Sequence, residues 1–154
     1  MERRKEFKGD FSGEKFIFSN YYEIDIIIDG KIFQSVEHWF QANKATNEKD
    51  FEYVRESNTA GISKRRGRNI KLREDWDAIC EHVMYIGAKE KFKQHKHLRD
   101  ALIATRGTIL EEGNNWGDTK WGVDYYTRKG QNKLGIILMR VREELYLEFI
   151  NEYQ

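Results

Sequence analysis

The sequence contains no proline, one cysteine and no long apolar run. The lone Cys80 excludes an internal disulfide, which fits a reducing compartment, and we expect it to be a small core residue. No apolar stretch approaches the roughly 20 residues that a bilayer-spanning helix needs, and residues 1–10 carry no apolar signal segment. We therefore expect a cytoplasmic protein with no membrane contact.

The sequence also lacks an excess of either charge. Its 27 basic and 26 acidic residues leave a formal net charge of +1. Broad electrostatic binding to nucleic acid is not indicated by this total, so an anion site must be local. The four histidines do not form a zinc pattern, and no metal site is predicted.

The 154 residues predict a single compact domain, mainly α with a small β-hairpin. Two β-prone runs, 23–28 and 31–34, flank Asp29-Gly30, which is a strong hairpin signal. Apolar residues at helical spacing predict helices that start after Ser35 and cover about 48–57, 75–92, about 97–104, and 133 to about 151. In the last helix, the predicted buried stripe consists of Leu134, Leu138, Val141, Leu145 and Phe149.

The stretch "SVEHWFQANKA" (35–45) carries Glu37, Gln41 and Lys44. Residues seven apart on a helix point within about 20° of each other, so these three are predicted to share one face. A solvated polar stripe is one interpretation. The other is an active site, because a carboxylate can stabilise oxocarbenium charge and a desolvated lysine can attack an opened sugar.

Two further segments have candidate binding chemistry. Residues 63–74 concentrate six basic residues, which is typical of either a basic surface or a phosphate site. Six of the twelve glycines fall between Gly107 and Gly135, which predicts a long irregular segment. Its Trp116 and Trp121 suit either stacking on a base or sugar, or anchoring of turns in the core.

Taken in order, these segments resemble the NADAR family, also described as YbiA-like. The family pattern has a Phe-Ser-Asn-aromatic stretch, a hairpin, an "EH-aromatic-FQA-x-K" helix, a "GR…LR-x-dW" block, a "KF-x-(Q/N)" helix end and a Trp-Gly to Leu-Gly finish. The resemblance covers about residues 16–146 and rests on residues 18–21, 37–42, Lys44, 67–68, 72–73, 75–76, 91–92, Gln94, Asp118, 121–122, Asn132, 134–135, 138–139 and Arg142.

The resemblance implies an N-glycosidase that hydrolyses the bond between a phosphorylated or ADP-linked ribose and a nitrogen base, without a cofactor or metal. The substrate would be a ribosylaminopyrimidine phosphate of riboflavin synthesis, or ADP-ribosyl-guanine in DNA or RNA. Implied catalytic residues are Glu37, Lys44 and Asp118. Implied substrate contacts are Ser19, Asn20, Gln41, Arg68, Arg73, Trp121, Gly122 and Asn132. A family glutamate upstream of the Trp-Gly pair matches Glu111 or Glu112, and the spacing does not choose between them.

A different class of protein would use the same basic and aromatic residues. A non-catalytic module that binds ADP-ribose or a related nucleotide needs a phosphate patch and a stacking surface, but it does not need both Glu37 and Lys44. Their presence together therefore favours the enzyme. General nucleic-acid binding through residues 64–73 is weaker still, because the net charge is close to zero.

Overall fold

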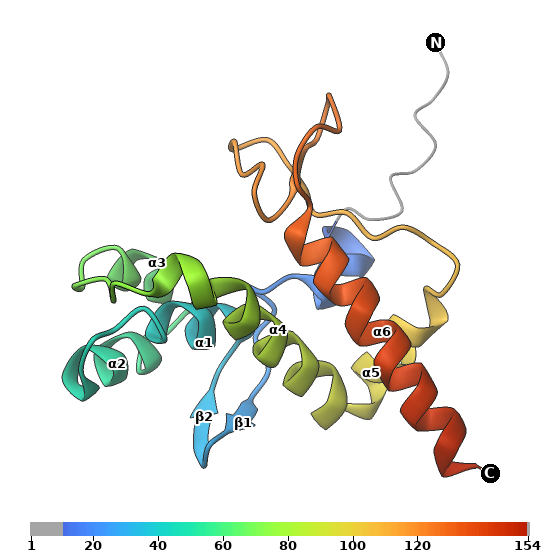
Figure 1. Ribbon diagram of the computed structural model, residues 1–154, viewed down its shortest axis with the longest axis horizontal. Coiled ribbons are helices and arrows are strands. Elements are labelled where there is room, and N and C mark those ends of the chain that lie inside the picture. The colour runs from blue at the N-terminus through green and yellow to red at the C-terminus, as the bar shows by residue number, and fades with distance from the viewer. Residues whose placement is uncertain (1–10, 154) are drawn as a thin grey trace. The chain divides into compact units, whose positions relative to one another are not determined.

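The computed structural model describes residues 11–153, so the predicted absence of a signal segment in residues 1–10 lies outside the described part. The described residues form two compact units: a central unit, residues 20–94, and a second unit built from residues 11–19 and 95–153. The architecture is helical with one small antiparallel hairpin, as predicted (Figure 1). No helix among the described residues is long and apolar enough to cross a membrane.

The hairpin opens the central unit. Strand β1 (Ile26–Ile28) pairs with β2 (Lys31–Phe33), with Ile26 opposite Phe33. The turn residues Asp29 and Gly30 both have positive φ, +52° and +76°, which is the geometry of the predicted two-residue turn. Both strands are shorter than predicted. A bond from the Ile24 amide to the Gln34 carbonyl (2.9 Å) extends the pairing beyond them.

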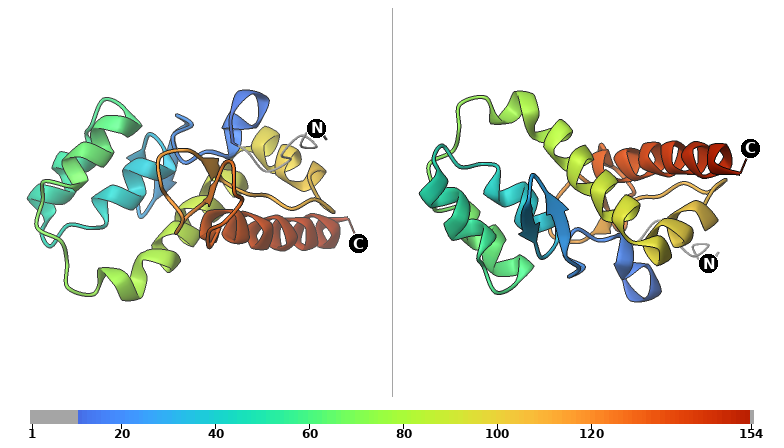
Figure 2. Two further views of the ribbon diagram at one scale, coloured as in Figure 1. Left: turned by 90° about the horizontal axis from the view of Figure 1, so that it is seen from above. Right: turned by 90° about the horizontal axis from the view of Figure 1, so that it is seen from below.

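Four helices follow: α1 (Val36–Ala42), α2 (Glu48–Arg55), α3 (Ala60–Gly67) and α4 (Trp76–Gln94). The side chains of Ser35, Asn47 and Thr59 cap the first three by accepting a backbone N–H of the first turn. Helix α1 packs on α2, α3 and α4, and all seven of its residues are buried (Figures 1 and 2). Helix α3 was not predicted, because its sequence has two glycines and a run of basic residues and therefore lacks the apolar spacing of a helix.

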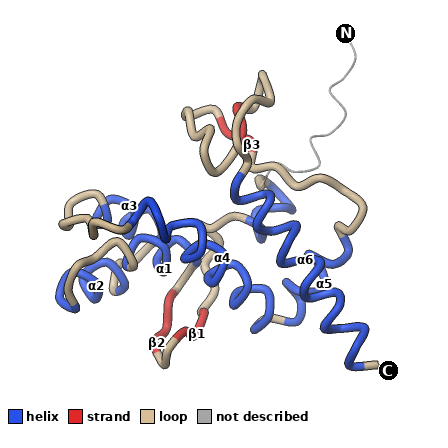
Figure 3. Tube along the Cα trace, viewed as in Figure 1, coloured by secondary structure: helices blue, strands red, loops and turns tan. Residues whose placement is uncertain are grey.

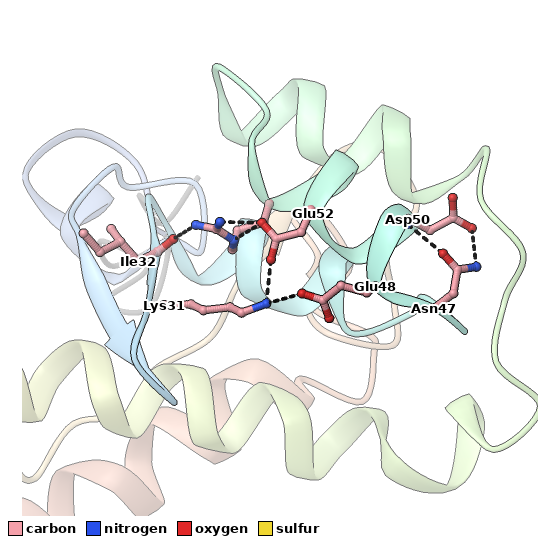
Figure 4. A network of polar contacts seen from close by, with 7 residues as sticks. Lys31, Ile32, Asn47, Glu48, Asp50 and Glu52 are labelled. Carbon is pink, nitrogen blue, oxygen red and sulfur yellow. Dashed lines mark hydrogen bonds and ion pairs between the residues drawn. The ribbon is translucent and has the colours of Figure 1, made fainter.

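An ionic network fastens the hairpin to α2 (Figure 4). The Lys31 ammonium lies 2.6 Å from a carboxylate oxygen of Glu48 and 2.6 Å from one of Glu52. Arg55 also pairs with Glu52 and donates to the Ile32 carbonyl (3.0 Å). Hydrogen bonds from Arg55 and then Lys31 lower the pKa of Glu52 to about 2. Single exposed ion pairs contribute little, so the network matters mainly by fixing the hairpin's position on α2.

His38 ties α1 to the turn between α2 and α3. It is fully buried, and its Nε2 lies 2.9 Å from the Ser57 carbonyl oxygen. A carbonyl can only accept, so Nε2 carries the proton and Nδ1 accepts from the Ser35 hydroxyl at 2.7 Å. Burial lowers the pKa of His38, and the Ser57 carbonyl and the charge of Glu23 only partly oppose this. The folded protein therefore holds this imidazole neutral.

Because His38 is buried and neutral, we expect the free energy of unfolding to fall in mild acid. The unfolded chain binds this proton near pH 6.5 and the folded chain only at lower pH, so the unfolded state gains protons first. The contribution of neutral His38 is complete above about pH 6.5 and falls as the pH drops below it, by up to about 1.4 kcal/mol per pH unit. Urea unfolding between pH 7.5 and 5.5 measures this slope.

The variants separate His38 from the other histidines in this experiment. His38→Gln should be less stable at neutral pH and should lose most of the wild-type slope. The matched control is His82→Gln, which changes an exposed histidine and should keep it. An unchanged slope in His38→Gln would contradict this assignment.

The second unit comprises the 3-10 helix η1 (Gly13–Phe18), α5 (Lys96–Ala104), the short strands β3 (Gly113–Asn114) and β4 (Val123–Asp124), and α6 (Lys133–Glu152). Helix α5 packs on α6. The predicted stripe of α6 is buried at its first four positions, whereas Phe149 is half-buried and contacts Tyr153 with a ring-centroid distance of 4.9 Å.

The segment between α5 and α6 is irregular, as its glycines predict (Figure 3). Strands β3 and β4 form a two-residue parallel pair within it. Asn132 has φ +51° and is buried; its amide donates to the Leu110 carbonyl (2.8 Å), and its oxygen accepts from the Glu112 amide (3.0 Å). Arg142 of α6 fixes the start of the segment. Its Nη1 donates to the carbonyls of Thr105 and Thr108, at 3.0 and 2.9 Å.

Candidate active site

Glu37 and Gln41 form a buried pair on α1. Their residues are 6% and 3% exposed, and the Gln41 Nε2 donates to Glu37 Oε1 at 2.7 Å. The backbone N–H of Glu37 donates to the Asn20 carbonyl (3.1 Å), which fixes the first turn of the helix. The predicted polar face is therefore not a solvated stripe. A carboxylate is held inside the central unit.

Lys44 lies beyond the end of α1, because the helix stops at Ala42 and Asn43 caps it. The Lys44 backbone N–H still donates to the Gln41 carbonyl (3.2 Å), and its own carbonyl accepts from the Arg73 N–H (3.0 Å). Its ammonium lies 5.7 Å from the ring centroid of Phe40 and 5.8 Å from that of Trp76. The ring centroids of Phe40 and Trp76 are 4.9 Å apart. The two rings together form an aromatic surface beside the amine, called here the Phe40–Trp76 wall.

The surroundings of Lys44 make its amine easier to deprotonate. Burial is the main cause that lowers its pKa, the charge of Glu37 opposes it, and the positive charges of Arg68 and Lys64 lower it further. A larger share of the amine is thus neutral than in an exposed lysine, and the neutral amine is the nucleophilic form. Glu37, Lys44, Lys64 and Arg68 form one electrostatic group in the central unit.

The basic residues of segment 63–74 have different partners in the folded structure. Arg66 stacks on the Tyr53 ring at 4.4 Å and donates to the Tyr53 carbonyl, so it holds α3 to α2. Arg73 makes a two-point ion pair with Asp75, at 2.6 and 3.0 Å. Arg68 caps the end of α3 and is exposed. Of the predicted phosphate contacts, Arg68 is the one whose charge acts on Lys44, and Arg73 is engaged by a carboxylate.

The remaining predicted residues are distributed over both units. Asn20 in the central unit donates through Nδ2 to the Met84 sulfur (3.3 Å). Ser19 caps the end of η1 in the second unit. In the irregular segment, the Asp118 carboxylate accepts from the N–H groups of Lys120 and Trp121, at 3.2 and 3.0 Å. Trp121 is half-buried, with the Lys120 ammonium 5.4 Å from its ring centroid.

Gly122 and Asn132 shape this segment. A Cβ at Gly122 would stand 2.2 Å from the Glu112 carbonyl oxygen and 2.9 Å from Glu112 Oε2, so Glu112 directs its carboxylate toward Gly122 inside the segment. Which of Glu111 and Glu112 matches the family glutamate stays a prediction. Both polar atoms of the Asn132 side chain bond to the backbone, so its role as a substrate contact stays a prediction.

Sequence reasoning assigned no role at the site to Phe40 or Trp76, and it interpreted Gly67 only as a position where the backbone could come close to a ligand. Phe40 stands four residues before Lys44, which is the helical spacing at which side chains meet, so this contact had a signal in the sequence. Trp76 comes from a segment 32 positions later, and Gly67 from a helix that was not predicted.

Across residues 11–153, no group of three or more His, Cys, Asp or Glu side chains could hold a metal ion.

A model of the NADAR domain matches residues 6–146. The chain belongs to the NADAR family. The N-glycosidase YbiA of Shigella boydii serotype 4 is 40% identical over 133 residues, which cover 85% of this chain and 82% of that protein. N-glycosidase Npun_R5314 of Nostoc punctiforme is 32% identical, with 83% of this chain and 84% of that protein covered.

Two further relatives extend the comparison. The NMR structure of YbiA from Escherichia coli has a TM-score of 0.82 and 37% identity, covering 92% of this chain and 84% of that one. Riboflavin biosynthesis protein VVA0006 of Vibrio vulnificus is 37% identical over 129 residues, covering 82% of this chain and 35% of that protein. The prediction of an enzyme acting on N-glycosidic bonds is thus confirmed at the level of the NADAR family.

Proposed function

We propose that this NADAR protein hydrolyses the N-glycosidic bond between a phosphate-bearing ribose and a nitrogen base. One observation carries the proposal: the amine of Lys44 lies against the Phe40–Trp76 wall with a lowered pKa, beside the buried carboxylate of Glu37. A nucleotide-binding module has no use for a partly desolvated amine next to a buried carboxylate. An enzyme that traps an opened sugar uses both.

The chemistry proceeds in two steps. The neutral amine of Lys44 attacks C1 of the ribose. The bond from C1 to the base breaks, and the base leaves with the bonding electrons and takes up a proton. The bond from C1 to the ring oxygen then opens, the ring oxygen takes up a proton, and a Schiff base between C1 and the Lys44 nitrogen remains. Water then adds to C1 and releases the sugar, which regenerates the amine. Glu37 stabilises the positive charge that develops at the sugar as the base departs.

Recognition of the substrate is assigned to the other predicted residues. Arg68 carries an exposed guanidinium close enough to influence the Lys44 amine, which suits a phosphate of the same substrate. Asp118, Trp121 and Gly122 are proposed to contact the ribose, and Ser19, Asn20, Arg73 and Asn132 to contribute polar contacts. Tyr21, whose ring centroid lies 5.9 Å from the Lys64 ammonium, is a further aromatic side chain near this basic group.

Two substrates fit this chemistry. A ribosylaminopyrimidine phosphate agrees with the name of the Vibrio relative, a riboflavin biosynthesis protein. An ADP-ribosyl-guanine in DNA or RNA presents the same ribose bond to nitrogen, with a pyrophosphate in place of one phosphate.

The experiment offers purified protein each substrate separately and follows release by mass spectrometry. We expect release of ribose 5-phosphate from the pyrimidine, of ADP-ribose from modified DNA, or of both. Release from the pyrimidine alone indicates metabolite clearance, and release from DNA alone indicates reversal of a base modification. No release from either, with ADP-ribose still binding, would overturn the proposal in favour of the non-catalytic module.

A further inference from the structure

We propose that Gln41 is a positioning residue for Glu37, and that Gly67 of α3 is required because it leaves room for Gln41 to act. The inference deepens the proposed function, since Glu37 is the carboxylate of that site. It also revises the role that the sequence suggested for Gln41, which was a direct substrate contact.

The hydrogen bond between Gln41 and Glu37 fixes both side chains. The carboxylate can only accept, so the Gln41 Nε2 is the atom that faces Glu37, at 2.7 Å. The amide oxygen consequently points away from Glu37. This Oε1 atom is buried and has no hydrogen-bond partner among residues 11–153. Buried amide oxygens are nearly always paired, so an unpaired one needs a reason in the surrounding packing.

Gly67 provides that reason. A Cβ built on Gly67 would stand 2.2 Å from Gln41 Oε1 and 3.1 Å from both Cβ and Cδ of Gln41. The backbone of α3 therefore touches the glutamine amide directly and closes the space around it. Any other residue at position 67 would push the amide out of its present place.

The backbone conformation at Gly67 does not itself call for glycine. Its φ is not positive, and it lies within the α-helical residues of α3. Glycine is one of the poorest residues for an ordinary helical position, and alanine would favour the helix. Gly67 is the last residue of α3, and its close contact with Gln41 is the feature that distinguishes it from an ordinary position there. Space for Gln41 is the property that only glycine supplies here.

Glu37 needs such a support for its role. Its charge acts on Lys44 against the charges of Lys64 and Arg68, so the position of the carboxylate affects the Lys44 amine. The Gln41 donor favours the ionised carboxylate and holds it in one orientation. Loss of this donor leaves Glu37 in the same buried place, but less well held and easier to protonate.

The first test follows the Glu37 side-chain carboxyl by carbon NMR during a pH titration, and it does not depend on any activity. Gln41→Met keeps the volume of the side chain and removes the donor, so it should raise the titration midpoint of Glu37 by about one pH unit. Gly67→Ala should shift it in the same direction. The matched control is Gly61→Ala on the same helix, where a Cβ meets only Thr59 Oγ1 at 3.9 Å and the midpoint should not move.

The double variant decides whether Gly67 acts through Gln41. With Met at position 41 there is no donor left to displace, so Gly67→Ala should add little to the midpoint shift of Gln41→Met. Additive shifts would overturn the link between the two residues. An unmoved midpoint in Gln41→Met, in protein that remains folded, would overturn the positioning role itself.

Kinetics give a second readout once a substrate releases its base. Gln41→Met should lower kcat by about 10- to 100-fold and change KM much less, since it acts through Glu37. A large rise in KM with kcat unchanged would return Gln41 to the role of a substrate contact and overturn the inference. If the wild-type protein releases no base at all, the proposed function fails, and the NMR titration still decides the relation of Gln41, Gly67 and Glu37.

Discussion

Replacing Lys44 with alanine should lower kcat by about a thousandfold or more while leaving substrate affinity nearly unchanged. The reason is that Lys44 supplies the amine that forms the Schiff base, whereas Arg68 and the aromatic wall remain to bind the substrate. Single-turnover assays give the rate, and titration of the inactive variant with substrate gives the affinity.

Two companion experiments make this result specific. Lys44→Arg keeps a positive charge but has no nucleophilic amine, so it should be as inactive as the alanine variant. Borohydride reduction during turnover should join the ribose covalently to wild-type protein and to Lys49→Ala, an exposed-lysine control, but not to either Lys44 variant. Full activity in Lys44→Ala, or an adduct on another lysine, would show that the covalent step is wrong.

Replacing Arg142 with methionine should lower the free energy of unfolding by about 2–4 kcal/mol. The guanidinium donates to the Thr105 and Thr108 carbonyls and to the Thr105 hydroxyl (3.1 Å), and the residue is 6% exposed. Methionine fills similar space but supplies no donor, so all three bonds are lost, although the Thr105 carbonyl still accepts from the Thr108 N–H (3.0 Å) and the Thr108 hydroxyl (2.6 Å). Burial lowers the pKa of Arg142, so removal of the buried charge offsets part of the lost hydrogen bonding.

Urea denaturation of Arg142→Met beside Arg140→Met measures this effect. Arg140 lies on the same helix, its side chain is 62% exposed, and its ion pair with Glu144 spans 3.6 Å. Its replacement should change stability by less than about 0.5 kcal/mol. Equal effects of the two substitutions would indicate that the bonds to Thr105 and Thr108 make no net contribution to the free energy of unfolding.

The elements that the sequence predicted correctly carry their signal locally. The Asp29-Gly30 turn sets the hairpin, and Ser35 caps α1 as expected. Helix α6 repeats its apolar residues over five turns, so its limits were almost right. Helix α3 was missed because its buried residues, Ala60, Ser63 and Gly67, are small and therefore give no apolar period in the sequence.

In the candidate site too, contacts within one helix were predictable from the sequence, whereas contacts between distant segments were not. Glu37 and Gln41 are four residues apart on one helix, so their proximity follows from helical geometry alone. The contact of Lys44 with Trp76 and that of Gln41 with Gly67 depend on the paths of separate segments. The partners of Arg66 and Arg73 were equally hidden, because a run of basic residues has the same composition whether its charges face a ligand or a carboxylate.

The main-chain bond from the Arg73 N–H to the Lys44 carbonyl has a consequence for how this fold tolerates changes in loop length. Lys44 stands past the end of α1, so its backbone is held both by the bond from its N–H to the Gln41 carbonyl and by the connection between α3 and α4. An insertion between Arg68 and Arg73 would move the reactive amine without replacing any side chain of the site. The turn at Asp29-Gly30 has exposed residues and does not position the Lys44 backbone, so it is the better place to insert a tag or a reporter.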